Sequence, residues 1–410
     1  MSWHRRGGDL LVRAGAVADV ATGEILRDHG IRIEQGTITE VAPWSTGSNA
    51  SDHLDLRGHL VTPGLIDMHT HLPGAAAQGT YADFLSGSAA RDALLGAANA
   101  LTTLRAGFTT VRDVGCFRAF VDCDLRDAIF AGHVPGPRML AAGAFVTSSS
   151  GGGEITDLAT DIPLPPQYRL GVADSVDEVR RAVRMIAHRR VDLIKVIATG
   201  AVMTSGTIPG APEFTEAELA ACVDEARGYG LAVAAHAHGD EGALRSIRAG
   251  VRTIEHGTMI SDTAIAAMVE HETYYVPTTY VATWILDHGE ELGFPAEMLA
   301  KTRSVAGAAR DALGDAIDAG VKIAYGTDAV VYPHGLNARQ LAEFVDAGMT
   351  PMDALRSATV VAANCLARND LGTVAPGAVG DLIAVPGVDL NDMRAFEDVR
   401  LVIQAGHVIP

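Results

Sequence analysis

Between residues 191 and 328 the sequence alternates short apolar runs with amphipathic stretches, and this alternation constrains the fold more than any other feature. Runs such as VDLIKVIA, LAVAAHAH and VKIAYGTDA are typical of strands. One stretch between them predicts a helix that begins with a capping box of Thr215 and Glu218 and ends at Gly228. Repeated strand–helix units with nearly continuous apolar strands predict a parallel sheet covered on both faces. Enough such units close into a (β/α)8 TIM barrel, an α/β fold.

The two ends of the chain follow a different pattern from its middle. Short strand-like runs occupy both ends, for example GIRIEQGTITEV near the start and DVRLVIQAGHVI near the end. Because the termini of a domain often lie close together, these runs can pair into one small sheet. We therefore expect residues 1–61 and 370–410 to form a small β domain beside a barrel of residues 62–369. The chain has 410 residues, which suits this division, since such a barrel needs roughly 250 residues.

The composition limits which partners and which cellular compartment we expect for this protein. The formal net charge is −18, and so acidic a surface repels nucleic-acid backbones and anionic membranes. The four cysteines form no CxxC pair, which is typical of a reducing compartment. The N-terminal stretch has no apolar signal-peptide core, and no run approaches the roughly 18 apolar residues of a membrane span. We therefore expect a cytoplasmic protein that acts on a small molecule, with no nucleic acid or membrane as partner, and we expect a homo-oligomer.

Residues 145–175 are the least regular segment of the predicted barrel. The segment is rich in Ser, Gly and Pro and is longer than a strand-to-helix connection needs to be. A loop of this length in a compact domain is usually a lid or a binding loop. We therefore expect it to contact the substrate, and a tolerated surface insertion is the alternative.

Two histidines close the first strand predicted for the barrel. His69 and His71 follow the run LVTPGLIDM, and residues two apart on a strand point to the same side. Two imidazoles on one side can bind one divalent metal ion. Surface pairs of histidine also occur by chance, so this pair alone is weak grounds for a metal site.

A lysine interrupts one of the apolar strands. Lys195 lies inside the run LIKVI, where an unpaired ammonium group is costly. Burial lowers the pKa of a lysine, and a neutral amine can react with CO2 to form a carbamate. That carbamate is a carboxylate on a long arm, able to bridge two metal ions. The alternative is an ordinary ion pair between Lys195 and an acid on a neighbouring strand.

The other polar residues that can bind a metal also follow apolar strands. His236 and His238 close LAVAAHAH, His256 closes VRTIEHG and Asp328 closes VKIAYGTD. Each alone is compatible with a hydrogen-bonded core residue. Barrel enzymes place their chemistry at the carboxyl ends of the strands. A set of such residues at the ends of successive strands therefore predicts an active site there.

In this order, PGLIDMHTHL, the buried Lys195, AHAHG, EHG and GTDA resemble the binuclear amidohydrolases. Within that superfamily the chain is similar to imidazolonepropionase-like proteins, Xaa-Pro and Xaa-Arg dipeptidases, ochratoxin-degrading amidases and phenylurea hydrolases. The stretches GFTTVRDVG and PGAVGDLIAV also fit, so the resemblance covers nearly the whole chain. It implies a barrel flanked by a small β-sandwich built from both chain ends.

The resemblance also implies roles for single residues. It assigns two divalent metal ions, expected to be zinc, to six residues: His69, His71 and Asp328 for the more buried ion, His236 and His256 for the other, and Lys195, carboxylated by CO2, between them. The two ions would activate a bridging hydroxide for attack on an amide-like carbonyl carbon. Asp328 would orient that hydroxide and pass its proton to the leaving nitrogen. His238 would stabilise the developing oxyanion.

Substrate contacts are less clear from the sequence. Many members of this branch carry Gly-Gly-His in the loop after the third strand, where this chain has SGGGEITD with Glu154. We expect Glu154 to meet the substrate. Val202, Met203 and Tyr280 are further candidates that would favour an apolar acyl or aryl group, although all three could equally be packing residues. We therefore expect hydrolysis of a C–N bond in a dipeptide, an N-acyl amino acid or an aryl amide, and a urea or carbamate is the alternative substrate.

Two rival functions remain open. A one-metal deaminase of the same superfamily would use the HxxE pattern of His238 and Glu241 to shuttle protons. It has no need of a bridging lysine, and a metal count with an ammonia assay separates the two enzymes. The second rival is a non-catalytic assembly protein that has lost its metals, but this chain keeps every one of the six ligand positions.

Overall fold

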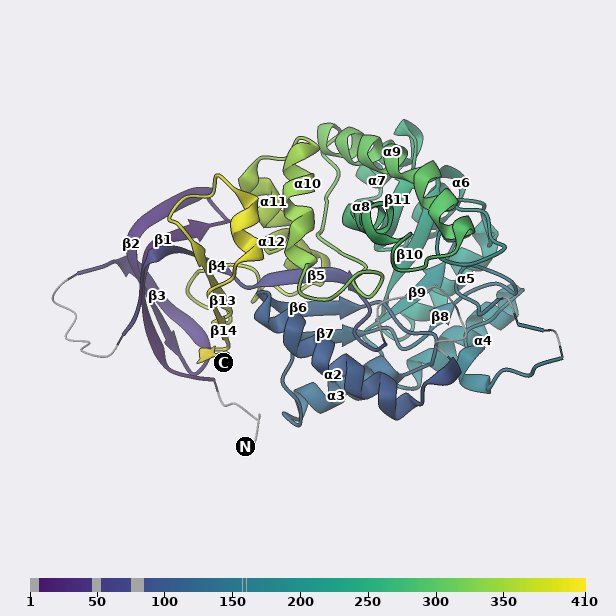
Figure 1. The fold of residues 1–410 in the computed structure, drawn as a ribbon, viewed down its shortest axis with the longest axis horizontal. Helices are drawn as coiled ribbons and strands as arrows, with labels where there is room; N and C mark the ends of the chain where they lie inside the picture. Colours follow the sequence, from purple (N-terminus) through teal and green to yellow (C-terminus); the bar gives the residue numbers. More distant parts are fainter. Residues whose placement is uncertain (1–6, 46–52, 75–84, 157, 160) are drawn as a thin grey trace.

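The computed structural model describes residues 7–45, 53–74, 85–156, 158–159 and 161–410. It confirms the predicted fold class, a (β/α)8 barrel joined to a small sheet made from both chain ends (Figure 1). In Figure 1 the small sheet lies on the left and the barrel on the right, and the small sheet meets the barrel at the first barrel strand.

Parallel strands build the barrel and end at one face. Seven of its eight positions are occupied by β5 (Leu65–Thr70), β6 (Phe108–Asp113), β7 (Arg138–Ala141) continued by β8 (Phe145–Val146), β9 (Leu193–Ile197), β10 (Ala232–Gly239), β11 (Thr253–Met259) and β12 (Tyr274–Val276). Residues 322–329 fill the eighth position. The amide of Ala324 donates to the carbonyl of Tyr275 at 2.9 Å, and the amide of Met68 donates to the carbonyl of Tyr325 at 2.8 Å. These bonds close the barrel between β12 and β5.

Helices cover the outside of the barrel (Figure 1). They are α2 (Ala89–Arg105), α3 (Val121–Phe130), α4 (Val176–Ala187), α5 (Glu216–Arg227), α6 (Asp240–Ala249), α7 (Asp262–Glu270), α8 (Thr279–His288), α9 (Ala296–Asp318), α10 (Gln340–Asp346), α11 (Pro351–Ser357) and α12 (Val360–Cys365). The predicted capping box of Thr215 and Glu218 begins α5, and Gly228 caps its end. Local sequence signals therefore mark both ends of this helix.

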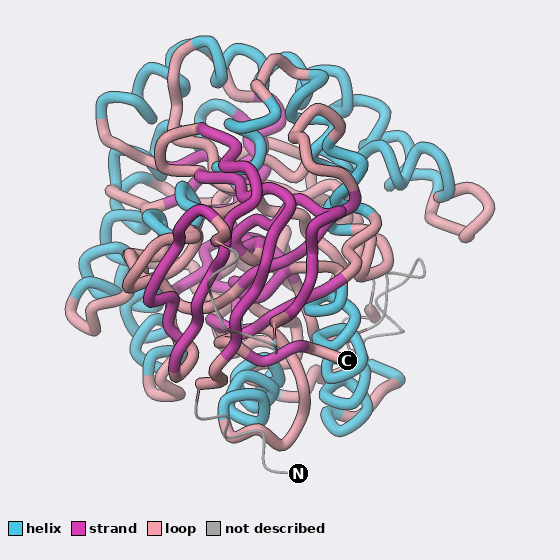
Figure 2. Tube along the Cα trace, turned by 90° about the vertical axis from the view of Figure 1, so that its left-hand side faces the viewer, coloured by secondary structure: helices cyan, strands magenta, loops and turns pink. Residues whose placement is uncertain are grey.

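A seven-stranded sheet combines both ends of the chain (Figure 2). Its strands, in spatial order, are β15 (His407–Val408), β14 (Leu401–Gln404), β13 (Leu382–Pro386), β4 (Leu54–Pro63), β1 (Leu10–Asp19), β2 (Glu24–Glu34) and β3 (Thr37–Pro43). The sheet bends over on itself as in a β-sandwich, because its edge strand β3 meets the segment just before β13. The amide of Ile38 on β3 donates to the carbonyl of Ala378 in that segment at 2.8 Å. Aliphatic side chains, among them Ile31 and Leu382, fill its interior. The exact division into residues 1–61 with 370–410 and 62–369 stays a prediction.

One glycine joins the small sheet to the barrel. Gly64 separates β4 from β5, and its amide donates to the carbonyl of Asp381 at 2.9 Å. A Cβ at this position would lie 2.2 Å from Oγ1 of Thr109 on β6, so no side chain fits here. The close approach holds the start of β5 against β6.

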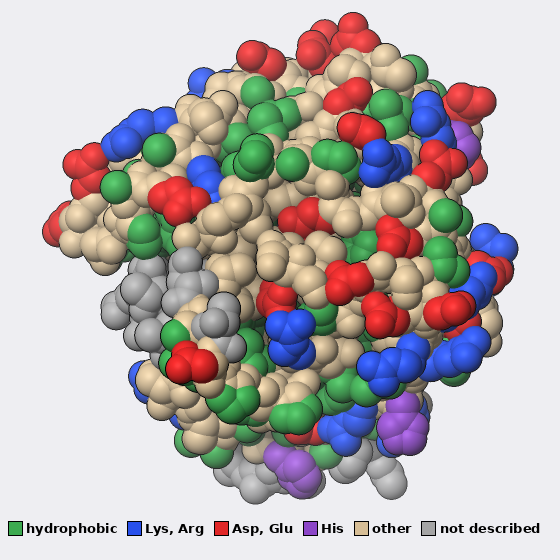
Figure 3. Space-filling model, turned by 90° about the vertical axis from the view of Figure 1, so that its right-hand side faces the viewer, with side chains coloured by type: hydrophobic (Ala, Val, Ile, Leu, Met, Phe, Trp, Pro, Cys, Tyr) green, Lys and Arg blue, Asp and Glu red, His purple; other side chains and the backbone are tan. Residues whose placement is uncertain are grey.

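The surface carries many acidic side chains on the barrel side of the molecule (Figure 3), in keeping with the net charge of −18. Within the described parts of the chain, no helix combines the length and the apolar character that a bilayer span requires.

Candidate active site

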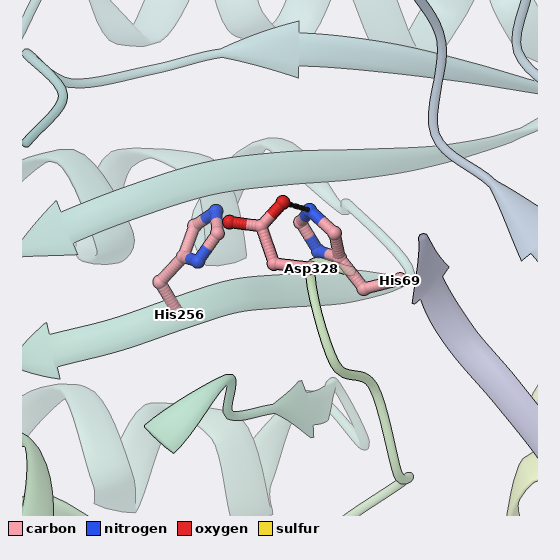
Figure 4. Close-up of side chains that lie close together, drawn as sticks. All are labelled: His69, His256 and Asp328. Atoms are coloured by element: carbon pink, nitrogen blue, oxygen red, sulfur yellow. Dashed lines mark ion pairs between the residues drawn. The ribbon is translucent and has the colours of Figure 1, made fainter. Parts of the chain in front are cut away.

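The predicted metal ligands lie together at the carboxyl ends of the barrel strands. Nε2 of His69 and Nε2 of His71 lie 3.5 Å and 3.3 Å from Oδ1 of Asp328. Figure 4 shows the carboxylate of Asp328 between the rings of His69 and His256, and one ligand atom from each of these three residues fits within 4.8 Å of the others. The ring centres of His236 and His256 are 4.5 Å apart. Donors from β5, β10, β11 and the eighth strand therefore converge on one small volume.

Hydrogen bonds fix the rings of the two histidines on β5. Nδ1 of His69 lies 2.8 Å from a carboxylate oxygen of Glu255, and Nδ1 of His71 lies 2.6 Å from the carbonyl oxygen of Gly115. An acceptor at Nδ1 holds the proton there and leaves the lone pair on Nε2. Both Nε2 atoms are therefore available to bind a cation beside Asp328.

The histidines on β10 and β11 are held by threonines. Nδ1 of His256 lies 2.8 Å from Oγ1 of Thr278, and Nδ1 of His238 lies 2.9 Å from Oγ1 of Thr258. Burial lowers the pKa of His238 to about 4, and it lowers the pKa of His256 well below its usual value together with the nearby His236. Neutral imidazoles can donate or accept at Nε2, so these rings suit a ligand or a hydrogen-bonding role.

A buried acid and a buried arginine stand behind His69. The second oxygen of Glu255 accepts a hydrogen bond from Nη2 of Arg112 at 2.6 Å, and Nε of Arg112 donates to the carbonyl of Met68 at 2.5 Å. Burial alone would raise the pKa of Glu255, but Arg112 and His69 outweigh it and the pKa is lowered. Glu255 is therefore a carboxylate despite its complete burial.

Two buried polar atoms in the site have no hydrogen-bond partner among the described residues. They are Nζ of Lys195 and Nε2 of His236. Burial lowers the pKa of Lys195 to about 8, so roughly a tenth of the amine is neutral at pH 7. A buried polar atom without a partner is rare and calls for an absent ligand or a modification. The predicted carbamate on Lys195 and a metal at His236 would each supply the missing partner.

The backbone around the site is under strain at two predicted ligands. His256 and Asp328 have φ angles of 67° and 57°, in the left-handed region that residues with a side chain rarely adopt. Gly326 passes so close to β5 that a Cβ there would lie 2.8 Å from Cβ of His69. Such conformations persist where the surrounding structure fixes them, and they are typical of functional sites.

A cavity of about 330 Å³ opens above these residues. The predicted ligands and His238 line its floor. Much of its wall is apolar. The apolar lining residues include Val281, Ile285, Met298 and Val305 from α8 and α9, Val202 and Met203 from the segment after β9, and Leu95, Phe117, Val121 and Phe145 from the part of the wall near α2, β6 and β8. A cavity of this size and character suits a small, largely apolar molecule.

The predicted substrate contacts divide into two groups. Val202 and Met203 line the cavity, as the sequence suggested. Glu154 and Tyr280 are not among the described residues that line it. Glu154 is buried against the guanidinium of Arg169 and accepts a hydrogen bond from the amide of Ser150 at 2.6 Å. Tyr280 is a packing residue whose hydroxyl accepts a hydrogen bond from Arg339 at 2.9 Å.

Part of the loop at 145–175 reaches the cavity through backbone rather than through Glu154. Gly152 and Gly153 line the cavity, and residues 157 and 160 lie outside the described residues. The carbonyl of Gly152 accepts a hydrogen bond from Oγ1 of Thr204 at 2.6 Å, and the carbonyl of Thr204 accepts one from Nζ of Lys301 at 2.8 Å. Lys301 on α9 also pairs with Glu297 at 2.8 Å. These contacts join the loop to α9 at the wall of the cavity. They run from Gly152 through Thr204 and Lys301 to Glu297.

Sequence reasoning missed the residues that hold the ligands. Glu255 and Thr278 contact predicted ligands, Arg112 contacts Glu255, and Thr258 contacts His238, but none of the four was singled out. The alternation of side chains along β11 offered one signal, since Glu255 directly precedes a proposed ligand in a strand that is buried on both faces. An acid in such a strand needs a partner, and the sequence does not show which partner the fold provides.

Convergent histidines and a carboxylate at the carboxyl ends of a (β/α)8 barrel define a barrel enzyme with donors suited to divalent metals. The chain belongs to the amidohydrolase family, whose sequence model matches residues 60–409. The ochratoxinase of Aspergillus niger is 32% identical over 405 residues, covering 93% of this chain and 82% of that protein. An imidazolonepropionase of Deinococcus radiodurans is 26% identical over 402 residues, covering 93% and 92% of the two chains.

Solved structures agree with this assignment. The crystal structure of a Xaa-Pro dipeptidase with bound methionine in its active site superposes with a TM-score of 0.91. It is 36% identical and covers 98% of this chain and 100% of the other. The family resemblance expected from the sequence is therefore confirmed, and the protein is an amidohydrolase.

Proposed function

We propose that this enzyme hydrolyses a C–N bond next to a carbonyl in a small, mostly apolar substrate, with two divalent metal ions as cofactors. The proposal is supported first by the two buried atoms without partners, Nζ of Lys195 and Nε2 of His236, within a cluster of donors. The apolar cavity above the cluster supports the kind of substrate. Ochratoxinase and Xaa-Pro dipeptidase, the relatives named above, support the class of reaction.

The residues present fit the metals. His69, His71 and Asp328 would hold one ion, His236 and His256 the other, and Lys195, once carboxylated, would contribute to both. The fit rests on the Nε2 atoms that Glu255 and Thr278 leave free, and on a lysine whose amine is partly neutral. Bound divalent ions would supply an activated water and a Lewis acid for the substrate carbonyl.

The chain itself moves the proton. The pKa of Asp328 would be raised by burial, but the neighbouring His69 and His71 outweigh this and lower it, so Asp328 is an anion at neutral pH. Its carboxylate would take the proton of the attacking water and pass it to the leaving nitrogen, which needs protonation because an amide anion is a poor leaving group. His238 lines the cavity, and its Nε2 would donate to the carbonyl oxygen as charge develops there.

The deaminase alternative has less support. It would use Glu241 of the HxxE pattern, which lies in the first turn of α6 and pairs with Arg245. The side chain of Glu241 is 61% exposed, and it is not among the described residues lining the cavity. Hydrolysis of an amide is therefore the better proposal.

A paired experiment tests the function. The metal-loaded enzyme and a chelator-treated sample are assayed for amine release from dipeptides, N-acyl amino acids, aryl amides, ureas and carbamates, with ammonia release from amino-heterocycles measured in parallel. Amide hydrolysis that is lost with the metal and restored by adding zinc supports the proposal. Ammonia release without amide hydrolysis would replace it with the deaminase.

A further inference from the structure

The eighth strand of the barrel, residues 322–329, leaves the regular ladder just before Asp328. The amides of Thr327 and Asp328 both donate to the carbonyl of His69, at 3.0 Å and 2.6 Å. Consecutive amides of a strand point in opposite directions, so a regular ladder does not produce this pair. The chain then turns sharply, since Asp328 has a φ angle of 57°. Regular strand pairing therefore does not explain how the side chain of Asp328 is held in place.

One buried carboxylate, that of Asp67 on β5, spans the seam between the first and the last barrel strand. Its Oδ1 accepts hydrogen bonds from the amides of His69 and Thr327, each at 3.1 Å. Its Oδ2 accepts hydrogen bonds from Oγ1 of Thr327 at 2.6 Å and from Nδ2 of Asn337 at 2.9 Å. A single oxygen thus holds the backbone of one predicted ligand, His69, and that of the residue directly before another, Asp328.

The partners of Asp67 are themselves fixed by further hydrogen bonds. Oγ1 of Thr327 accepts from the amide of Ala329 at 3.2 Å and from Nδ2 of Asn337 at 3.3 Å, so the hydroxyl proton is directed to Asp67. The side-chain oxygen of Asn337 accepts from the amide of Gly335 at 2.9 Å. Asp67, Thr327 and Asn337 are completely buried, and none of them is among the described residues that line the cavity. These three side chains hold backbone in place and do not contact the substrate.

We infer that Asp67 is a positioning residue which, together with Thr327 and Asn337, sets the place of the Asp328 carboxylate beside His69. Figure 4 shows the two side chains facing each other, with Oδ1 of Asp328 3.5 Å from Nε2 of His69. Asp67 acts on the metal site and on proton transfer only through these two residues. The inference rests on the proposed function, in which His69 and Asp328 bind one ion and Asp328 moves the proton.

An exchange of carboxylate and amide between Asp67 and Asn337 tests the inference. Asp67→Asn keeps the shape of the side chain but sets an N–H donor against Nδ2 of Asn337, and Asn337→Asp sets two carboxylates against each other. The double variant again sets a donor against an acceptor. Chelator-treated protein is titrated with Co²⁺, and the affinity and the absorption spectrum of the bound ion are measured. We expect each single variant to lower the affinity about tenfold, and the double variant to recover most of this loss.

Asp381→Asn is the matched control for loss of a buried carboxylate. Asp381 lies just before β13, where it accepts a hydrogen bond from the amide of Ala405 and pairs with Arg138, each at 2.8 Å. This variant should lower the melting temperature but leave Co²⁺ binding as in the wild type, which separates positioning from a general loss of stability. Unchanged Co²⁺ affinity in Asp67→Asn overturns the inference, and so does a loss of affinity that the double variant does not recover.

Crystal structures of the metal-free variants separate this inference from the proposed function. If the wild type binds no Co²⁺, the proposed function fails, but the position of Asp328 still decides the inference. An Asp328 that moves away from His69 in Asp67→Asn and returns in the double variant supports it, and an Asp328 that keeps its place overturns it. If Asp67→Asn does not fold, Thr327→Val, which removes one of the four donors, takes its place in the same measurements.

Discussion

The carboxylate of Glu255 lies 2.8 Å from Nδ1 of His69, and both side chains are almost completely shielded from solvent. This contact fixes which nitrogen of His69 faces Asp328. It also depends on Arg112, which pairs with the other oxygen of Glu255. A predicted metal ligand is therefore held by an ion pair that is buried inside the barrel and is not among the described residues lining the cavity.

Glu255→Gln should weaken metal binding by about ten- to a hundredfold, because an amide is a poorer acceptor for the ring N–H of His69. Competition with a chromogenic chelator measures the affinity directly. Glu272→Gln, at an exposed acid that pairs with Lys322, is the matched control and should bind metal as the wild type does. Unchanged affinity in Glu255→Gln would show that His69 is oriented by other contacts.

Lys195→Ala should lose metal and activity together, and small carboxylates such as acetate or propionate should restore part of both. A short acid can occupy the space that the carbamate is proposed to fill, since Nζ of Lys195 is buried without a partner. Elemental analysis counts the metals, with two per chain expected in the wild type. A fully active enzyme with one metal, or with an unmodified amine, would contradict the proposal.

Asp328→Asn should reduce turnover of an amide by several orders of magnitude, about as far as loss of general acid–base catalysis allows. Asparagine tolerates the positive φ of 57° at this position, so the fold should survive the change. His238→Asn should cost about a hundredfold, as for one oxyanion donor. Metal content is measured in both variants, because loss of metal would give the same result for another reason. Near-normal turnover in Asp328→Asn with both metals present would refute its role.

Glu154→Gln should destabilise the loop at the cavity wall by about 1–3 kcal/mol, because it leaves Arg169 without its buried anion. Limited proteolysis of this loop, compared with that of the wild type, reports the change. Arg169→Gln provides the reciprocal variant and should have a similar effect. If Glu154→Gln instead changes only which substrates are cleaved, the residue meets the substrate as the sequence first suggested.

Glu213 gives the same loop a dependence on pH. Burial raises the pKa of Glu213 to about 7 from its usual value of 4.5, although the amide of Gly152 donates to its carboxylate. The folded state therefore binds this proton more tightly than the unfolded state. The resulting stabilisation is complete below about pH 4.5 and is lost as the pH rises to about 7.

The glutamine of Glu213→Gln carries no charge at any of these pH values. The melting temperature of this variant minus that of the wild type should therefore increase between pH 5 and about pH 7. Scanning calorimetry of both proteins over this interval measures the difference. Glu291→Gln, at an exposed acid on the surface, should run parallel to the wild type. A parallel course for Glu213→Gln would mean that this carboxyl group is not buried in solution.

The sequence predicted the elements that local patterns control. The strand–helix alternation indicated the barrel, and the capping box at Thr215 located the start of α5 correctly. The position of His69, His71 and Asp328 at strand ends also followed from sequence, because parallel strands bring their carboxyl ends to one face. These features depend on neighbours within a few residues or on the topology of the whole fold.

Side-chain contacts between distant segments could not be predicted in the same way. Glu154 was expected at the substrate because of its place in a loop, but Arg169 lies close enough to hold it away from the cavity. Tyr280 was expected as an apolar lining residue of the pocket, yet it is not among the described lining residues, and its hydroxyl accepts a hydrogen bond from Arg339. Arg112 reaches Glu255 across the barrel, a separation of 143 residues that no local pattern encodes. Such pairings are set by three-dimensional packing.

Gly64 has a consequence for how the protein is made. It joins β4 directly to β5, the strand that carries His69 and His71, and the two neighbours of β4 in the sheet are β1 and β13. One neighbour precedes β4 in the chain, and the other follows the whole barrel. The barrel and β13 must therefore be synthesised before both edges of β4 are paired. A chain released early, or trimmed to a minimal barrel, would keep the histidines but lose the anchor that positions their strand.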